Sequence, residues 1–346
     1  MSTAPQHSAA TPRLRVAAAA IRRHDGAILL SVRPAHTAHG GLWEFPGGKL
    51  EARERPVDGL ARELVEELGI HIERATPLIT VRHVYPKAEV ELIVFEVRDW
   101  QGEPHGREGQ HVEWVDISKL SALQFPAANL PVTTAVTLPR VMMVTPDLGA
   151  DEDAFLTRLE ACLAAGVELV QLRIRALGEQ RRRVVTAALA ACARHHARLM
   201  LNGSAQDAVA LGAHGVHLNR QRLFECEARP VAATMLLSAA CHDARELAQA
   251  ERIGVDFVYL SPVLATTSHA GAETLGWPRL RALCTATRLP VYALGGMTPP
   301  QLPRAVRAGC QGIAMLSGLW EHAAPAALLE RAAKELAKAA RHIKPG

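Results

Sequence analysis

The chain has 346 residues, of which 49% are hydrophobic and 21% are charged, and its formal net charge is +4. These values are ordinary for a globular protein with room for two domain cores, and the modest charge does not argue for a nucleic-acid coat or a basic membrane-surface patch. The longest early apolar run, 16–21, is too short for a signal peptide or a membrane span. Six scattered cysteines without a CxxC pair are typical of reduced thiols, so we expect a cytoplasmic protein. From the modest charge and the short apolar runs, we expect neither a membrane nor a nucleic acid as a direct partner.

The first third of the chain predicts one mixed α/β unit at 14–136, after a disordered tail at 1–13. Asp25-Gly26 is a hairpin signal between the first two strands. Pro56 and Gly69 are placed to begin and end a helix, because proline suits a first turn and glycine suits a helix end. Apolar or alternating runs predict four strands, at 16–21, 28–32, 89–97 and 112–115.

A different pattern begins at Arg140, after a junction at 136–139. Eight short apolar runs follow, at 141–145, 167–172, 199–201, 215–218, 235–237, 257–260, 291–294 and 312–316. Helical patterns separate most of them, for example at 151–165, 179–195, 243–253 and 299–308. Eight strand–helix units predict a closed (β/α)₈ barrel at 137–346, with a doubly wound open sheet as the alternative.

Acidic side chains gather between Gly47 and Ile70, on the loop and helix that Pro56 and Gly69 delimit. Leu60, Leu64 and Leu68 recur every four residues and predict the buried stripe of the helix. Three glutamates of the helix, Glu63, Glu66 and Glu67, lie three and four residues apart and therefore share another face. Acids so crowded repel one another unless a cation lies between them, and such oxygen ligands suit Mg²⁺ or Mn²⁺. An ordinary solvated acidic helix is the alternative interpretation.

The spacing of Gly48, Glu54, Arg62-Glu63-Leu64, Glu66-Glu67 and Gly69-Ile70 fills the Nudix box, so the segment resembles Nudix hydrolases. The resemblance to the MutT-type subgroup extends over nearly all of 14–136, through 42–49, 102–104, 107–110, 113–114 and 125–131. It implies a Nudix α/β/α sandwich with a mixed sheet. It also implies hydrolysis of oxidised purine nucleoside triphosphates such as 8-oxo-dGTP, which would keep damaged nucleotides out of DNA.

The same resemblance implies roles for individual residues. Glu63 would be the general base, and Arg62 would orient it. The metal shell would comprise Gly47 through its carbonyl, Glu66, Glu67 and Glu108. Arg33, Phe45 and Asn129 would bind the substrate. Glu54 is either a second-shell residue of the site or a helix N-terminal acid favoured by the dipole.

Asn129 carries the substrate argument. Oxidation at C8 of guanine turns N7 into a donor beside the O6 acceptor, and a carboxamide offers one acceptor and one donor to that edge. A buried mismatch of this kind with ordinary guanine can discriminate by roughly 10⁴-fold. Between prolines, an asparagine can also be plain turn chemistry.

The second half resembles the barrels of thiamine phosphate synthases and thiazole tautomerases, through 144–146, 170–175, 215–218, 238–242, 261–263 and 294–297. The resemblance implies a phosphate or ligand site at the carboxyl ends of the strands, formed by Gln171, Arg173, Arg175, Asn202, Gly295, Gly296 and Ser317. His242 occupies the position of the tautomerase histidine. Gly203 and Arg222 stand where the synthases carry two aspartates that hold Mg²⁺, which argues against thiamine phosphate synthesis.

Three hypotheses follow. The chain is a nucleotide-sanitising hydrolase with an appended barrel, or a thiamine-pathway enzyme whose Nudix half acts on a pathway pyrophosphate. Alternatively, it is a hydrolase whose barrel only binds a phosphorylated small molecule or holds a homodimer together.

Overall fold

The computed structural model describes residues 13–37, 39–174, 178–266, 271 and 273–343. Within the chain, one compact unit contains the residues up to Ala75, Thr80–Leu130 and the residues from His342, and a second contains Thr76–Ile79 and Pro131–Arg341. Of the predicted tail at 1–13, residues 1–12 lie outside the described part. The prediction is wrong for Arg13, which begins strand β1 and donates a 3.1 Å hydrogen bond to Glu91.

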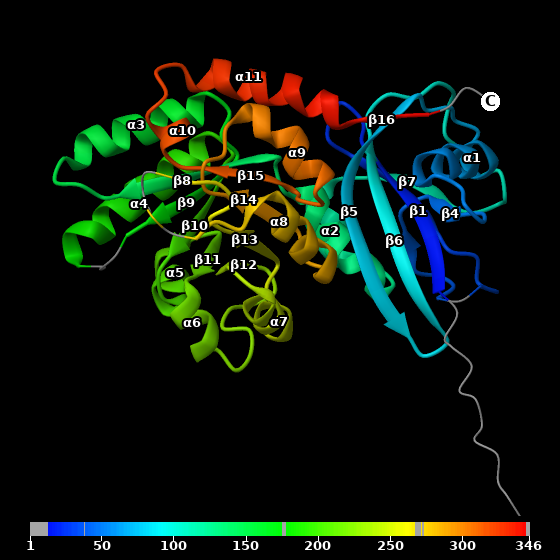
Figure 1. Cartoon of the computed structure of the whole chain (residues 1–346), viewed down its shortest axis with the longest axis horizontal. Coiled ribbons are helices and arrows are strands. Elements are labelled where there is room, and N and C mark those ends of the chain that lie inside the picture. Colours follow the sequence, from blue (N-terminus) through cyan, green and yellow to red (C-terminus); the bar gives the residue numbers. More distant parts are fainter. Residues whose placement is uncertain (1–12, 38, 175–177, 267–270, 272, 344–346) are drawn as a thin grey trace, which may run out of the picture. The chain divides into compact units, whose positions relative to one another are not determined.

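The first unit contains a mixed five-stranded sheet in the order β16-β5-β6-β1-β4, whose long strands are visible in Figure 1. Strand β1 runs parallel to β6 and antiparallel to β4. These strands are β1 (Arg13–Ile21), β4 (Gly47–Lys49), β5 (Arg74–Tyr85), β6 (Ala88–Val97) and β16 (Arg341–His342). A smaller antiparallel sheet contains β2 (Ile28–Val32), β3 (Trp43–Glu44) and β7 (Val112–Val115). The expected mixed sheet is confirmed, whereas β5 was not predicted.

Helix α1 (Pro56–Leu68) packs on the mixed sheet and carries the acidic segment. Leu60, Leu64 and Leu68 are fully buried against strand residues such as Ala17 and Phe95, which confirms the predicted stripe. Pro56 occupies the first turn, and Gly69 ends the helix in a left-handed conformation with φ of 69°. Because the stripe fixes the rotation of the helix, the acidic face points away from the core.

The second unit is a closed parallel barrel in the order β10-β11-β12-β13-β14-β15-β8-β9. Its strands are β8 (Val141–Asp147), β9 (Leu169–Arg173), β10 (Arg198–Asn202), β11 (Gly215–Leu218), β12 (Leu236–Cys241), β13 (Phe257–Leu260), β14 (Val291–Leu294) and β15 (Gly312–Met315). Pairing of β15 with β8 closes the barrel, so the open-sheet alternative is wrong. Aromatic rings of Phe257, Tyr259 and Tyr292 fill the interior.

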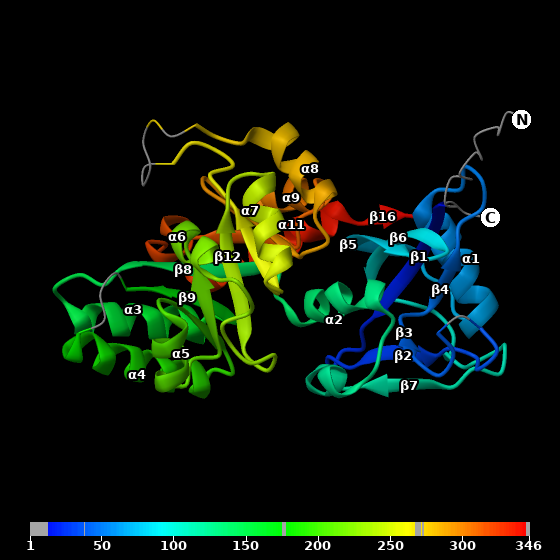
Figure 2. The same ribbon diagram turned by 90° about the horizontal axis from the view of Figure 1, so that it is seen from below.

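Helices cover the outside of the barrel, as α3 and α4 do beside β8 and β9 in Figure 2. They are α3 (Glu152–Ala164), α4 (Glu179–Arg194), α5 (Ala205–Leu211), α6 (Arg220–Glu225), α7 (Ala244–Arg252), α8 (Gly276–Ala286), α9 (Leu302–Arg307), α10 (Ser317–Trp320) and α11 (Pro325–Leu336). All six cysteines are free thiols. No helix in the described ranges is long and apolar enough to cross a membrane.

The ends of the second unit differ from the predicted 137–346. Helix α2 (Leu130–Thr137) belongs to this unit from Pro131 onward. The side chain of Gln311, at the amino-terminal end of β15, donates to the carbonyls of Ala135 and Leu138 and thereby holds α2 and the residues after it to the barrel. At the other end, β16 lies in the mixed sheet of the first unit, where the Ile343 N–H donates to the Glu73 carbonyl at 3.1 Å.

Candidate functional site

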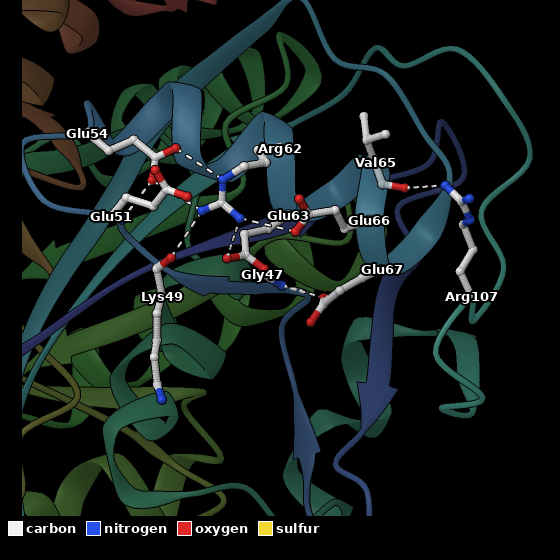
Figure 3. A network of polar contacts seen from close by, with 10 residues as sticks. All are labelled: Gly47, Lys49, Glu51, Glu54, Arg62, Glu63, Val65, Glu66, Glu67 and Arg107. Atoms are coloured by element: carbon white, nitrogen blue, oxygen red, sulfur yellow. Dashed lines mark hydrogen bonds and ion pairs between the residues drawn. The ribbon is translucent and has the colours of Figure 1, made fainter.

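The acidic face of α1 is organised around the guanidinium of Arg62, which Figure 3 shows among four acceptor groups. Its Nη1 donates to Glu63 Oε1 at 3.0 Å and to Glu66 Oε2 at 3.1 Å. Its Nε and Nη2 each lie 3.2 Å from an oxygen of Glu54, and Nη2 also donates to the Lys49 carbonyl. The five donors of a guanidinium suit this arrangement, and no ammonium could reproduce it.

The same contacts settle the position of Glu54. Both of its oxygens accept from Arg62, and Oε2 also accepts the Glu51 N–H at 2.9 Å. The hydrogen bonds from Arg62 are the main cause of the lowered pKa of Glu54. Glu54 therefore anchors Arg62 from outside the acidic face.

The glycine loop before the helix leaves space for the carboxylates. A Cβ on Gly48 would lie 2.1 Å from Glu63 Oε2, so only glycine allows that carboxylate to lie over the loop. Gly47 has φ of 140°, and its N–H donates to Glu67 Oε2 at 3.0 Å. The backbone of the loop therefore fixes the position of two of the three glutamates.

Burial and like charge disfavour ionisation of the central acids. Burial raises the pKa of Glu67 to about 8; the Gly47 N–H opposes this shift, and the charges of Glu44, Glu63 and Glu108 add to it. Burial also raises the pKa of Glu63, an effect that Arg62 partly offsets. Carboxylates held close in a partly buried site, with one arginine among them, are a donor set that fits Mg²⁺ or Mn²⁺.

The described residues nevertheless contain no preformed group of three or more His, Cys, Asp or Glu side chains converging on one point. The hydrogen bonds explain this difference from the predicted metal shell. Arg62 draws Glu66 toward itself, while Glu67 turns toward the Gly47 N–H. The shell of Gly47, Glu66, Glu67 and Glu108 thus stays a prediction.

Glu108 reaches the helix through the loop at 105–110, which covers the carboxyl end of α1. Arg107 donates from its backbone to the Glu67 carbonyl at 2.9 Å and from Nη1 to the Val65 carbonyl at 2.8 Å. Gln110 Nε2 adds a bond to the same Glu67 carbonyl at 3.1 Å. These donors satisfy carbonyls that a helix end leaves open, and they hold the exposed Glu108 near Glu67.

Two of the predicted substrate residues lie deeper than a simple contact surface would require. Arg33 is ion-paired through Nη1 with Glu44, and both side chains are about one-quarter exposed. Phe45 is only 2% exposed and stacks on Phe125 with ring centroids 5.9 Å apart. Phe45 therefore supports the site from within the core.

Asn129 ends the 3₁₀ turn at Ala127–Asn129 and is 9% exposed. Its backbone N–H donates to the Pro126 carbonyl at 2.9 Å. Within the described part of the chain, its carboxamide makes no hydrogen bond. A ligand that reaches this amide can therefore bond to both its acceptor and its donor.

The barrel contains a cavity of about 590 Å³ at the carboxyl ends of its strands. Five of the predicted barrel residues line it, namely Arg173, His242, Gly295, Gly296 and Ser317. Gln171 lies deeper, with Oε1 buried and without a hydrogen-bond partner among the described residues. Asn202 ends β10 and is not among the lining residues, and Arg175 lies outside the described residues.

His242 is oriented by Glu246, the first-turn acid of α7. Glu246 Oε2 accepts the His242 backbone N–H at 2.7 Å and lies 2.8 Å from His242 Nδ1. The Glu246 carboxylate is almost fully buried, and Arg220 Nε lies 2.8 Å from its other oxygen. A carboxylate at Nδ1 fixes the tautomer that leaves Nε2 free to accept a proton.

Comparison with known proteins agrees with both units. A family model described as a NUDIX domain matches residues 17–135, and one described as thiamine monophosphate synthase matches residues 141–319. The 8-oxo-dGTP diphosphatase of Escherichia coli (strain K12) is 37% identical over 120 residues, which are 35% of this chain and 93% of that protein. The chain belongs to both families.

Two further relatives mark the extent of the likeness. The thiamine-phosphate synthase of Synechococcus sp. (strain WH7803) is 34% identical over 192 residues, and the match spans 54% of each chain. A solved MutT structure, from work on Aliivibrio salmonicida and Vibrio cholerae, is 38% identical. It covers 36% of this chain and 96% of that one, with a TM-score of 0.32.

Sequence reasoning missed two kinds of residue in this chain. Arg107 and Gln110 position Glu108 through helix carbonyls, and no side-chain spacing signals such bonds. Glu246 follows His242 by four residues, a helical spacing that could have indicated the pair.

His217 provides a pH test of the barrel interior. It is 3% exposed, contacts Ser238 Oγ at 2.9 Å through Nδ1 and stacks on Tyr259. Burial, followed by the charges of Arg173 and Arg222, lowers its pKa to about 3. We predict that its ring stays neutral between pH 8 and pH 5. In NMR titrations, the signal that is lost in His217→Gln should not shift over this range, and a sigmoidal shift centred near pH 6 would contradict the prediction.

Proposed function

We propose that the Nudix unit hydrolyses purine nucleoside triphosphates oxidised at C8, converting 8-oxo-dGTP to 8-oxo-dGMP and pyrophosphate. The observation that carries this proposal is the arrangement of three glutamates beside a glycine loop, with Glu63 and Glu66 bonded to Arg62 and Glu67 bonded to the Gly47 N–H. The names of the matched relatives support the same substrate. Such an activity would remove oxidised nucleotides before they enter DNA.

The chemistry follows from the charges of the site. Mg²⁺ or Mn²⁺ held by Glu66, Glu67, Glu108 and the Gly47 carbonyl would neutralise phosphate oxygens of the substrate. Glu63 takes a proton from the attacking water while the water oxygen forms its bond to phosphorus. The phosphorus–oxygen bond that joins the nucleoside monophosphate to pyrophosphate then breaks. Arg62 keeps one oxygen of Glu63 occupied, which leaves the other toward the water. Arg33, held by Glu44, supplies positive charge for the phosphates.

Recognition of the base rests on Asn129. Its carboxamide can accept from N7–H and donate to O6 of an 8-oxopurine, and its burial makes a mismatched partner costly. Ordinary guanine presents two acceptors on the same edge. The amide acceptor would then face a lone pair, so selectivity follows from one side chain.

For the barrel, we propose binding of a phosphorylated small molecule in the 590 Å³ cavity, with the phosphate on the backbone of Gly295 and Gly296 and near Ser317. The pair of His242 and Glu246 at this cavity favours a second candidate function, proton transfer on a phosphorylated substrate as in a thiazole tautomerase. A thiamine-pathway enzyme with a Nudix half is therefore the alternative to a nucleotide-sanitising hydrolase.

Glu63→Gln should lose about 10²–10⁴-fold of the rate on 8-oxo-dGTP, because an amide cannot take the proton of water. The exchange is nearly isosteric, so the thermal midpoint should change little. Glu103→Gln, on an exposed loop, is the matched control and should retain activity. Single-turnover pyrophosphate release measures both variants, and a near wild-type rate in Glu63→Gln would remove this residue from the role.

Asn129→Ala should lower the preference for 8-oxo-dGTP over dGTP much more than it lowers the rate on dGTP. Only the oxidised base uses both ends of the amide, so only its binding loses two hydrogen bonds. The ratio of kcat/KM values for the two nucleotides measures this effect. An unchanged ratio would show that the base is recognised elsewhere and would favour the thiamine-pathway alternative.

The barrel should not make thiamine phosphate. Gly203 has no side chain and Arg222 brings a positive charge at the two positions where the resembled synthases hold Mg²⁺. The test incubates the full chain with the pyrimidine pyrophosphate, the thiazole phosphate and Mg²⁺, and follows thiamine phosphate as its fluorescent oxidised product. Turnover near the common enzyme range of about 1 s⁻¹ or above would contradict the prediction.

A further inference from the structure

Tyr85 links the end of β5 to the turn that carries Asn129. Its hydroxyl accepts a hydrogen bond from the Ala128 N–H, with 3.1 Å between the oxygen and nitrogen atoms. Ala128 is 3% exposed and directly precedes Asn129. Pro126, at the start of the turn, has no side-chain group that could cap this N–H. The tyrosine hydroxyl thus satisfies a buried donor that the turn itself leaves open.

The ring of Tyr85 is fixed by two histidines. The centroid of His83 lies 4.4 Å from it in an edge-on arrangement, and that of His39 lies 5.1 Å away. His39 belongs to the loop between β2 and β3, whose Gly41 N–H donates to the Arg33 carbonyl at 2.9 Å. One side chain therefore joins the β5–β6 hairpin, the loop after Arg33 and the turn before Asn129.

This link matters because the carboxamide of Asn129 follows the backbone of the turn that carries it. Its orientation depends on the backbone of the turn, which is held by the Pro126 carbonyl and by the Tyr85 hydroxyl. A bidentate pair with a base needs both hydrogen bonds in line at once. A small rotation of the turn weakens both bonds, whereas a single contact would tolerate it.

We propose that Tyr85 is a positioning residue for base recognition, which sets the preference for the oxidised purine by holding the Asn129 turn through its hydroxyl. The inference rests on the proposed hydrolysis of 8-oxo-dGTP and deepens it. Tyr85 acts on binding of the base and takes no part in the proton transfer at Glu63. Its removal should therefore change affinity for the oxidised base more than it changes kcat.

The test is Tyr85→Phe in the full chain, which keeps the ring between the histidines and removes only the hydroxyl. The ratio of kcat/KM for 8-oxo-dGTP to that for dGTP should fall about tenfold, the effect expected for one hydrogen bond. The fall should appear in KM for 8-oxo-dGTP. Calorimetric titration with 8-oxo-dGMP and dGMP, without turnover, should show weaker binding of the oxidised nucleotide alone.

Two variants bracket this result. Tyr259→Phe removes a buried hydroxyl from the barrel and should leave the ratio unchanged, whereas Asn129→Ala sets the largest loss. A wild-type ratio in Tyr85→Phe beside a reduced ratio in Asn129→Ala would overturn the role of Tyr85 and leave the proposed function intact. Equal use of the two nucleotides by the wild-type protein would overturn both.

Discussion

The guanidinium of Arg62 holds three of the acids in the Nudix site, Glu54, Glu63 and Glu66. Three carboxylates within reach of one another would separate in water, because their mutual repulsion exceeds any attraction between their stems. Arg62 holds Glu63 and Glu66 on one side and is itself held by Glu54 and the Lys49 carbonyl on the other. The acidic face is thus organised before any cation arrives.

Two features of the fold hold this arrangement rigid. The leucine stripe of α1 sets the rotation of the helix against the sheet, and the glycine loop clears the volume that the carboxylate of Glu63 occupies. Glu67 alone takes its hydrogen bond from the backbone and not from Arg62, and it has the most strongly raised pKa of these acids. Glu67, which the guanidinium does not contact, is therefore the acid whose ionised form a bound cation would stabilise most.

Periodicity and turn chemistry predicted most of the framework. The strands at 28–32, 112–115, 215–218, 257–260 and 291–294 have the bounds found in the structure, because each is a short run, and all but the strand at 112–115 are largely buried. Strand β5 was missed because Arg74, Arg82 and His83 interrupt its apolar alternation. Local patterns also could not predict the roles of Tyr85 or Arg107, whose hydrogen-bond partners lie forty or more residues away in sequence.

The addition of β16 to the mixed sheet has a consequence for how the protein is made. Strand β5 is twelve residues long, and the two-residue strand β16 pairs with only part of its outer edge. An open edge of that length is a template for pairing with other chains. During synthesis the first unit emerges long before residues 341–343, so its edge stays open while the whole barrel is translated. Residues 341–343 join the sheet only after the barrel has been translated, so a ribosome that stalls within the barrel leaves this part of the edge exposed.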